Sequence, residues 1–289
     1  MTQPSPRVCV LPYGQRFGWT PARLPLTALH WPLGVPDGID GQTLADLAPE
    51  DHLLTPPSTT LFFRPGFGTR ARVSVMFLEP RAVHHKHMAL AGLFHRRFYR
   101  VLTADTALLA QCPNAAFFPI GGAWVPDWHS IDLTKTAMCS LIASGKTKQP
   151  GHKLRHATVD WARKTGQDID IMGRGYKPFE AKSDGLARYR YSVIIENARE
   201  QNYFTEKLID ALLCRTVPIY WGCPNIGDFF DTDGMMICND LTGIEQAIAQ
   251  MSDADYTARL PALDRAREVA ASTYMDFYLR AAQTVLAAG

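Results

Sequence analysis

Residues 191–222 read YSVIIENAREQNYFTEKLIDALLCRTVPIYWG, and this stretch decides the fold class of the second half of the chain. It opens with an apolar run at 191–195 and closes with another at 217–221. Both runs have the composition of strands buried on both faces of a parallel sheet. Between them, residues 205–214 carry apolar side chains at the spacing of one helical face. Strand, helix and strand in this order predict a βαβ unit.

The rest of the second half continues the same alternation. Residues 137–143 and 169–172 are predicted strands with a predicted helix at 153–164 between them, and residues 256–288 are predicted to be mostly helix. We therefore expect an α/β, doubly wound parallel sheet. Because ligands bind beyond the carboxyl ends of such strands, a cleft is expected around Gly173, Glu196 and Gly222.

The first half contains short strands separated by Pro/Gly loops. The predicted strands are residues 7–11, 60–63, 72–78 and 100–103. The predicted helices are residues 87–94 and 104–111. We place a boundary at 128–135, which gives domains 1–134 and 135–289, with the terminal helix able to pack back on the first.

Composition narrows the class of partner. Of 289 residues, 46% are hydrophobic and 20% charged, as in an ordinary globular protein, and the net charge of +2 predicts neither nucleic acid nor membrane as partner. Residues 135–190 nevertheless carry twelve Lys or Arg against five Asp or Glu, a net +7, and residues 191–260 carry four against eleven, a net −7. These blocks are either two solvated faces or a cationic wall for a phosphate-bearing ligand.

Cysteine use and the chain start predict the compartment. The six cysteines form no C-x-x-C pair, which favours reduced, mostly buried thiols. Residues 1–6 are polar and lead into no signal-like apolar run, and no window is apolar enough for a membrane span. We expect a cytoplasmic protein with no integral membrane segment.

Three short motifs could carry other chemistry. Residues 144–147, SGKT, resemble the end of a phosphate-binding loop, but Ser140 stands where that loop needs glycine. The D-x-D pairs at 168–170 and 231–233 precede apolar runs instead of following them, which favours loop carboxylates. Residues 84–87, HHKH, lack ligands at metal spacing and favour a solvated or acceptor-contacting patch.

The start of the helix predicted at 205–214 is suited to phosphate. Tyr203, Glu206 and Lys207 lie at i, i+3 and i+4, so they gather over its first turn. Unpaired backbone N–H groups and the positive end of the helix dipole favour an anion there, and Lys207 adds a full charge.

The stretch from Tyr191 to Gly222 resembles the signature of the family 10 glycosyltransferases, the α-1,3/4-fucosyltransferases. The shared pattern is a strand with Glu-Asn, then Tyr-x-Thr-Glu-Lys, then Val-Pro-x-x-x-Gly. Upstream, 140–144 followed by 152–155 resembles the family's strand, loop and helix that bear a donor-binding arginine. Residues 77–80, FLEP, resemble its strand-end glutamate near proline.

The resemblance implies a GT-B architecture, with two Rossmann-like domains facing a central cleft. It implies inverting, metal-independent transfer of fucose from GDP-fucose to a glycan acceptor in polysaccharide biosynthesis, with no cofactor. Carried over by position, Glu79 is the general base. The implied donor-binding residues are Arg155, Glu196, Asn197, Tyr203, Glu206 and Lys207.

The chain also departs from the family pattern. Ala198 stands where the family commonly has serine, Asn202 where it often has an acidic residue, and the Glu-x-Pro spacing shrinks to Glu79-Pro80. Three alternatives remain open: the same fold with another nucleotide sugar, a non-catalytic relative that binds glycan or nucleotide, and an NTPase that depends on Lys146.

Overall fold

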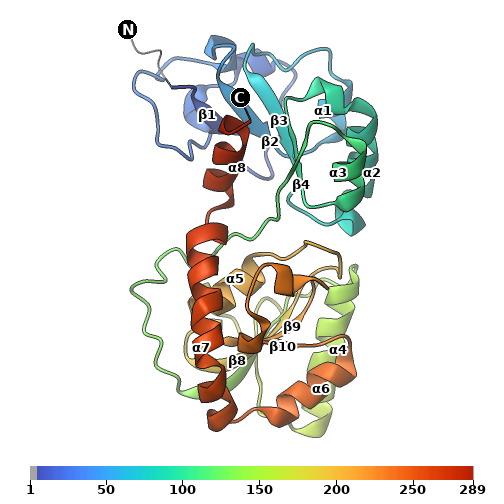
Figure 1. The fold of residues 1–289 in the computed structure, drawn as a ribbon, viewed down its shortest axis with the longest axis vertical. Coiled ribbons are helices and arrows are strands. Elements are labelled where there is room, and N and C mark those ends of the chain that lie inside the picture. The colour runs from blue at the N-terminus through green and yellow to red at the C-terminus, as the bar shows by residue number, and fades with distance from the viewer. Residues whose placement is uncertain (1–4, 289) are drawn as a thin grey trace. The chain divides into compact units, whose positions relative to one another are not determined.

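The computed structural model describes residues 5–288, which form two compact α/β units (Figure 1). One unit contains the described residues up to Pro119 and those from Phe277 onward, and the other spans Ile120–Asp276. Each contains a five-stranded sheet in which all strands are parallel, so the predicted pair of Rossmann-like α/β domains is confirmed. The prediction that residues 1–6 form no secretory signal concerns a segment whose first four residues lie outside the described residues.

The sheet of the N-terminal unit follows chain order, β1-β2-β3-β4-β5. Its strands are β1 (Val8–Val10), β2 (His52–Thr55), β3 (Arg72–Met76), β4 (Val101–Thr103) and β5 (Ala115–Phe117). The helices between them are α1 (Thr59–Phe63), α2 (Arg81–Phe94) and α3 (Thr106–Gln111). Because each step to the next parallel strand is right-handed, an order without reversal puts all connections on one face of the sheet.

The other face of this sheet is covered by α8 (Phe277–Leu286), which returns from the far end of the chain (Figure 1). Val10 and Leu54 alternate with residues that face the opposite core, and they pack with Ala282 and Val285 of α8. All four side chains are fully buried. The helix therefore completes a core that the first 119 residues leave open.

The boundary after Pro119 comes earlier than the predicted one at 134. The segment that follows Pro119 packs on the C-terminal unit, since the Gly121 amide donates to the Phe204 carbonyl at 3.2 Å. The Trp124 amide donates to the Asp210 carboxylate at 2.7 Å, and Val125 is buried in the same core. This loop carries no pattern that reveals its packing, so composition alone misplaces the boundary.

The C-terminal sheet has the order β10-β9-β8-β6-β7. Its strands are β6 (Ala137–Ile142), β7 (Asp170–Met172), β8 (Tyr189–Ile195), β9 (Val217–Trp221) and β10 (Met236–Ile237). Its helices are α4 (Pro150–Thr165), α5 (Glu206–Leu213), α6 (Leu241–Gln250) and α7 (Asp253–Val269). The helix α4 packs with α6, and α5 packs with α7. The order reverses between β6 and β8, which makes this sheet doubly wound as predicted.

One predicted element is wrong. Residues 60–63 belong to the helix α1 and not to a strand, because a short apolar run has no periodicity that separates the two and the segment follows Pro56-Pro57-Ser58. The tail from 256 onward is mostly helix, as predicted, with a π-helical turn at Ala270–Tyr274 between α7 and α8. The strands β2, β5 and β10 are short and were not predicted.

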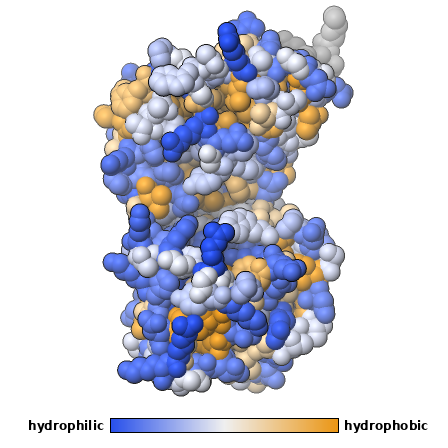
Figure 2. Space-filling view, turned by 180° about the vertical axis from the view of Figure 1, so that it is seen from behind, coloured by the Kyte–Doolittle hydropathy of each residue, from blue (hydrophilic) through white to orange (hydrophobic). Residues whose placement is uncertain are grey.

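The surface is ordinary for a globular chain. Figure 2 shows one face on which hydrophilic residues predominate and hydrophobic ones occur in small separate areas. Within residues 5–288, no helix combines the length and the apolar character that crossing a bilayer requires. All six cysteines are free and buried, as predicted.

Candidate active site

The reversal of strand order in the C-terminal sheet lies between β6 and β8, and this is the position at which open α/β sheets bind ligands. Glu196 and Asn197 follow directly on the carboxyl end of β8. The loop that begins at Ala143 follows the carboxyl end of β6 and leads into α4. The first turns of α4 and α5 supply the remaining residues of the cluster.

The first turn of α4 lies against the end of β8. A Cβ atom on Gly151 would sit 1.7 Å from the Glu196 carbonyl oxygen, so only glycine allows this approach. The Gly151 amide donates to the Asn197 carbonyl at 3.1 Å. This contact brings Arg155, one turn further along α4, to the same strand end.

Arg155 is 6% exposed and held by two groups at the strand end. Its Nε and Nη2 donate to the Ile195 carbonyl at 3.0 and 2.7 Å, and Nη2 also donates to Asn197 Oδ1 at 3.0 Å. Its Nη1 makes no hydrogen bond within residues 5–288. Burial lowers the pKa of Arg155 and the Glu196 charge opposes that shift, yet a guanidinium remains charged at any physiological pH. The strand end therefore carries a fixed cation with a donor to spare.

The start of α5 is fixed by a buried carboxylate. Glu196 is fully buried, its Oε1 accepts from the Thr205 amide at 2.8 Å and its Oε2 accepts from the Thr205 hydroxyl at 2.7 Å. Thr205 is in turn the N-cap of α5. Glu196 thus holds the helix start and presents no oxygen to a ligand.

Lys207 joins the two acids of this region. Its Nζ lies 3.0 Å from Glu206 Oε1, 3.0 Å from the Thr205 hydroxyl and 3.7 Å from Glu196 Oε2. Burial alone would lower the pKa of Lys207, but Glu206 and Glu196 raise it above its ordinary value. Burial would likewise raise the pKa of Glu206, and Lys207 lowers it instead. Both groups are charged at neutral pH.

The predicted donor residues of the second half therefore form one cluster. Tyr203, 3% exposed, interacts electrostatically with Arg155, as do Glu196 and Glu206. The cluster joins the ends of β8, α4 and α5 around two cations and the positive end of a helix. Such an arrangement suits a phosphate group.

Sequence reasoning missed three residues beside this cluster. The Lys182 ammonium lies 5.5 Å from the centre of the Trp124 ring and in the electrostatic field of Glu206, Lys207 and Arg155. Asp210 lies one turn beyond Glu206 on α5 and is fully buried. Burial raises the pKa of Asp210 to about 7, although Lys182 opposes the shift. A buried Asp in an otherwise apolar helix face was the signal that could have revealed them.

Glu79 lies in the N-terminal unit, just beyond the carboxyl end of β3 and before Pro80, the N-cap of α2. Tyr13 donates from its hydroxyl to Glu79 Oε1 at 3.5 Å. Arg81 and Asp105 form an ion pair, and Arg81 Nε donates to Asp105 Oδ2 at 2.7 Å. These residues follow β1, β3 and β4, so they share the carboxyl edge of that sheet.

The histidine run lies in the first turns of α2. The Nδ1 atoms of His84 and His87 are 3.0 Å apart, and His87 Nε2 is 3.3 Å from the Thr59 hydroxyl. Burial lowers the pKa of His84 to about 4, and burial also lowers the pKa of His87 below its ordinary value. Both are therefore neutral at pH 7. Within residues 5–288, no three or more His, Cys, Asp or Glu side chains are grouped as metal ligands.

The other short motifs serve local structure. The loop at 144–147 does not lead directly into a helix, because α4 starts only at Pro150, and Gly145 stands in open space. Asp170 accepts from the Tyr189 hydroxyl at 2.6 Å, and Asp231 pairs with Arg265 at 2.7 Å. Asp170 is the first residue of β7 and not the loop residue that was predicted, and Asp231 caps a short 3-10 helix.

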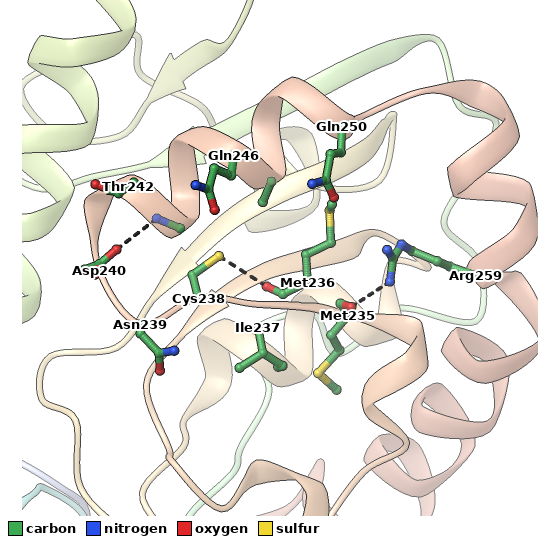
Figure 3. A pocket seen from close by; sticks show the side chains of 12 residues that line it. Met235, Met236, Ile237, Cys238, Asn239, Asp240, Thr242, Gln246, Gln250 and Arg259 are labelled. Atoms are coloured by element: carbon green, nitrogen blue, oxygen red, sulfur yellow. Dashed lines mark hydrogen bonds between the residues drawn. The ribbon is translucent and has the colours of Figure 1, made fainter.

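A cavity of about 560 Å³ lies between β10 and α6 (Figure 3). Gln246 and Gln250 of α6 line it opposite Met236, and Arg259 reaches it from α7. None of the predicted site residues lines this cavity. The carbonyl of Asn239, which lines the cavity, accepts from Trp221 Nε1 at 3.0 Å, and the Trp221 carbonyl accepts from the Glu196 amide at 2.9 Å.

The sequence of the C-terminal unit is similar to known transferases. Residues 133–256 match the model of glycosyltransferase family 10 (fucosyltransferase), C-terminal part. The α-(1,3)-fucosyltransferase FucT of Helicobacter pylori is 34% identical over 121 residues, which cover 40% of this chain and 24% of that protein. A fucosyltransferase-like protein of Arabidopsis thaliana is 32% identical over 103 residues, 34% of this chain and 20% of that protein. The chain thus spans about a quarter or less of the length of these relatives.

Solved structures extend the likeness to both units. An α1,3-fucosyltransferase superposes with a TM-score of 0.51 at 17% identity, over 82% of this chain and 78% of that one. TarM gives 0.55 at 13% identity over 83% and 55% of the two chains. The trehalose 6-phosphate synthase of Burkholderia multivorans gives 0.56 at 9% identity over 84% and 72%. These neighbours have the GT-B fold, so the predicted fold type is confirmed.

Proposed function

We propose that this chain is a fucosyltransferase of glycosyltransferase family 10, whose model matches residues 133–256, and that it transfers fucose from GDP-fucose to a hydroxyl group of a glycan. The observation that carries the proposal is the cluster at the strand reversal of the C-terminal sheet. There Arg155 and Lys207 meet the N-terminus of α5 on the segment that matches the family.

The donor would bind through its diphosphate. Arg155 Nη1 and the Lys207 ammonium are the cations available to its oxygens, and the positive end of the α5 dipole adds a partial charge of the same sign. Tyr203, Glu206 and Asn197 would border the same ligand. Glu196 would act through Thr205, because both of its oxygens are already bonded.

The chemistry is a single displacement with inversion. The acceptor oxygen forms a bond to the anomeric carbon of fucose while the bond from that carbon to the GDP oxygen breaks. Negative charge then develops on the diphosphate, which Arg155 and Lys207 stabilise. These two cations do the work that a divalent metal does elsewhere, which supports a metal-independent reaction.

The acceptor hydroxyl must lose a proton, and Glu79 would accept it as general base. Its support is its position beyond a buried strand, on the edge where Tyr13 and the Arg81–Asp105 pair also lie. A carboxylate at this sheet edge would accept one proton per turnover and pass it on to solvent.

The test is a transfer screen with the full chain in a chelating buffer. Nucleotide sugars with GDP and UDP are offered with a panel of fucose-free glycans, and products are followed by mass spectrometry and by release of the nucleotide. We expect a deoxyhexose to be added only from GDP-fucose, with the anomeric configuration of the new bond opposite to that in the donor. Transfer from another nucleotide sugar would show that the donor is not GDP-fucose. GDP binding without transfer to any glycan would favour a non-catalytic relative.

A further inference from the structure

The loop between β8 and α5, residues 196–205, contains a residue with an unusual backbone. Asn202 has φ +62°, in the left-handed region, and Arg215 is the only other non-glycine residue among 5–288 with positive φ. This conformation brings Cβ close to the following carbonyl, and glycine or asparagine tolerates it best. The bend at Asn202 is therefore built into the loop.

Asn225, in the loop after β9, bonds to both the backbone and the side chain of Asn202. The Asn202 amide donates to Asn225 Oδ1 at 2.9 Å, and Asn225 Nδ2 donates to Asn202 Oδ1 at 2.8 Å. Asn225 Nδ2 also donates to Asp228 Oδ2 at 2.9 Å, and the Cys223 thiol lies 3.1 Å from Asn225 Oδ1. This Asn202–Asn225 clasp joins the loop after β8 to the loop after β9.

The three residues after the bend are those that build the donor cluster. Tyr203 is buried and interacts electrostatically with Arg155. Phe204 is fully buried, and Thr205 bonds to Glu196 and caps α5. A change of φ at Asn202 would rotate the chain at this point and move Tyr203 and Thr205 away from their partners.

We propose that Asn202 is a positioning residue of the donor site, whose left-handed backbone, locked by Asn225, aims Tyr203 and Thr205. The inference rests on the proposed function, because it takes GDP as the ligand of this site. The backbone conformation of Asn202 has the larger effect on the position of Tyr203 and Thr205, and the side chain of Asn202 has the smaller one. Glycine at 202 keeps the bend and the backbone bond to Asn225 Oδ1 and loses the side-chain bond of the clasp, whereas alanine and valine oppose the bend itself.

The test is a series at one position, read by titration of GDP and by donor kinetics. We expect Asn202→Gly to bind GDP within about threefold of wild type, Asn202→Ala to bind several-fold more weakly, and Asn202→Val about tenfold or more. Asn225→Ala removes both bonds of the clasp together with the bond to Asp228, and it should weaken GDP binding at least as much as Asn202→Gly. The KM for GDP-fucose should rise in the same order, while kcat at saturating donor stays within about twofold.

Arg215 supplies the matched control, since it has φ +53° but lies at the opposite end of α5. Arg215→Ala should lower the Tm and leave the affinity for GDP unchanged. Equal GDP affinity in Asn202→Ala and wild type would overturn the inference, as would a loss in Arg215→Ala as large as that in Asn202→Ala. If Asn202→Val does not fold, the GDP affinities of Asn202→Ala and Arg215→Ala still test the inference. Absence of GDP binding by the wild-type chain would instead refute the proposed function.

Discussion

Glu196 binds Thr205 with both oxygens of its carboxylate, at 2.8 Å to the backbone amide and 2.7 Å to the hydroxyl. The first residue after a central strand thereby fixes the first residue of the helix that follows nine positions later. Because Glu196 is fully buried, these bonds are shielded from water and depend on one another. The start of α5, with Lys207 in its first turn, is therefore held rigidly at the strand end.

Two substitutions of Glu196 should destabilise this arrangement to different degrees. Glu196→Gln keeps an acceptor for the Thr205 amide and can donate to its hydroxyl, so we expect a loss of about 1 kcal/mol in the free energy of unfolding. Glu196→Ala leaves two buried donors unpaired and a cavity, and should cost about 3 kcal/mol or more. Urea denaturation measures both. Similar losses for the two variants would contradict a role through hydrogen bonding.

Arg155→Ala should weaken GDP binding by about 10- to 100-fold, the effect of a charge-assisted contact of roughly 1.5–3 kcal/mol. Lys153→Ala is the matched control, because it removes the same charge from an exposed position on the same helix. Calorimetric titration compares them at equal ionic strength. If both variants bind GDP equally well, the cation at the strand end takes no part in binding.

Asp210 should make the stability depend on pH. Its pKa rises from 3.8 in the unfolded chain to about 7 in the folded one, so its contribution is present below about pH 4 and is lost as the pH rises through about 7. Asp210→Asn cannot ionise, and it should be more stable than wild type by a few kcal/mol at pH 8. The difference should vanish near pH 4. Chemical denaturation between pH 4 and pH 8 measures the free energy of unfolding of both proteins. An equal pH dependence in the two would contradict a raised pKa for Asp210 in the folded chain.

The N-terminal unit should depend on α8. Ala282 is fully buried against the sheet face that this helix covers. Ala282→Asp would bury an unpaired carboxylate, and we expect a loss of several kcal/mol with exposure of apolar surface to a hydrophobic dye. Ala288, near the end of the chain, is the control position, where Ala288→Asp should leave the Tm nearly unchanged. A wild-type Tm for Ala282→Asp would show that the helix does not seal this core.

Glu79→Gln separates binding from chemistry. Without a general base the transfer rate should fall by a factor of about 10²–10⁴, while GDP affinity stays unchanged because Glu79 lies in the other unit. Glu50→Gln, an exposed acid of the same unit, should transfer normally. Wild-type transfer by Glu79→Gln would remove this residue from the mechanism.

The parts of the fold that could be predicted are those with strong local patterns. The strand β8 ends in the nearly apolar run at 191–195, and α5 shows a clear helical face, so both were predicted within two residues. The segment α1 could not be assigned from its three apolar residues alone. The boundary at Pro119 and the docking of α8 depend on contacts between distant segments, which leave no periodic signal.

In the candidate site, too, the contacts within one element could be predicted and those between distant segments could not. Tyr203, Glu206 and Lys207 could be grouped because one helical turn brings them together. The Glu196 carboxylate is instead bonded to Thr205, nine residues further along the chain, and no local pattern predicts this contact. Lys182 and Asp210 were missed for the same reason, since they meet only in the folded chain.

The most direct measurement is a calorimetric titration of the full chain with GDP-fucose in the presence of EDTA, beside identical titrations with GDP and with UDP-sugars. We predict saturable binding of one GDP-fucose per chain, comparable binding of GDP, and none of the UDP-sugars. Absence of GDP and GDP-fucose binding, or binding that appears only when a divalent metal is restored, would contradict the account.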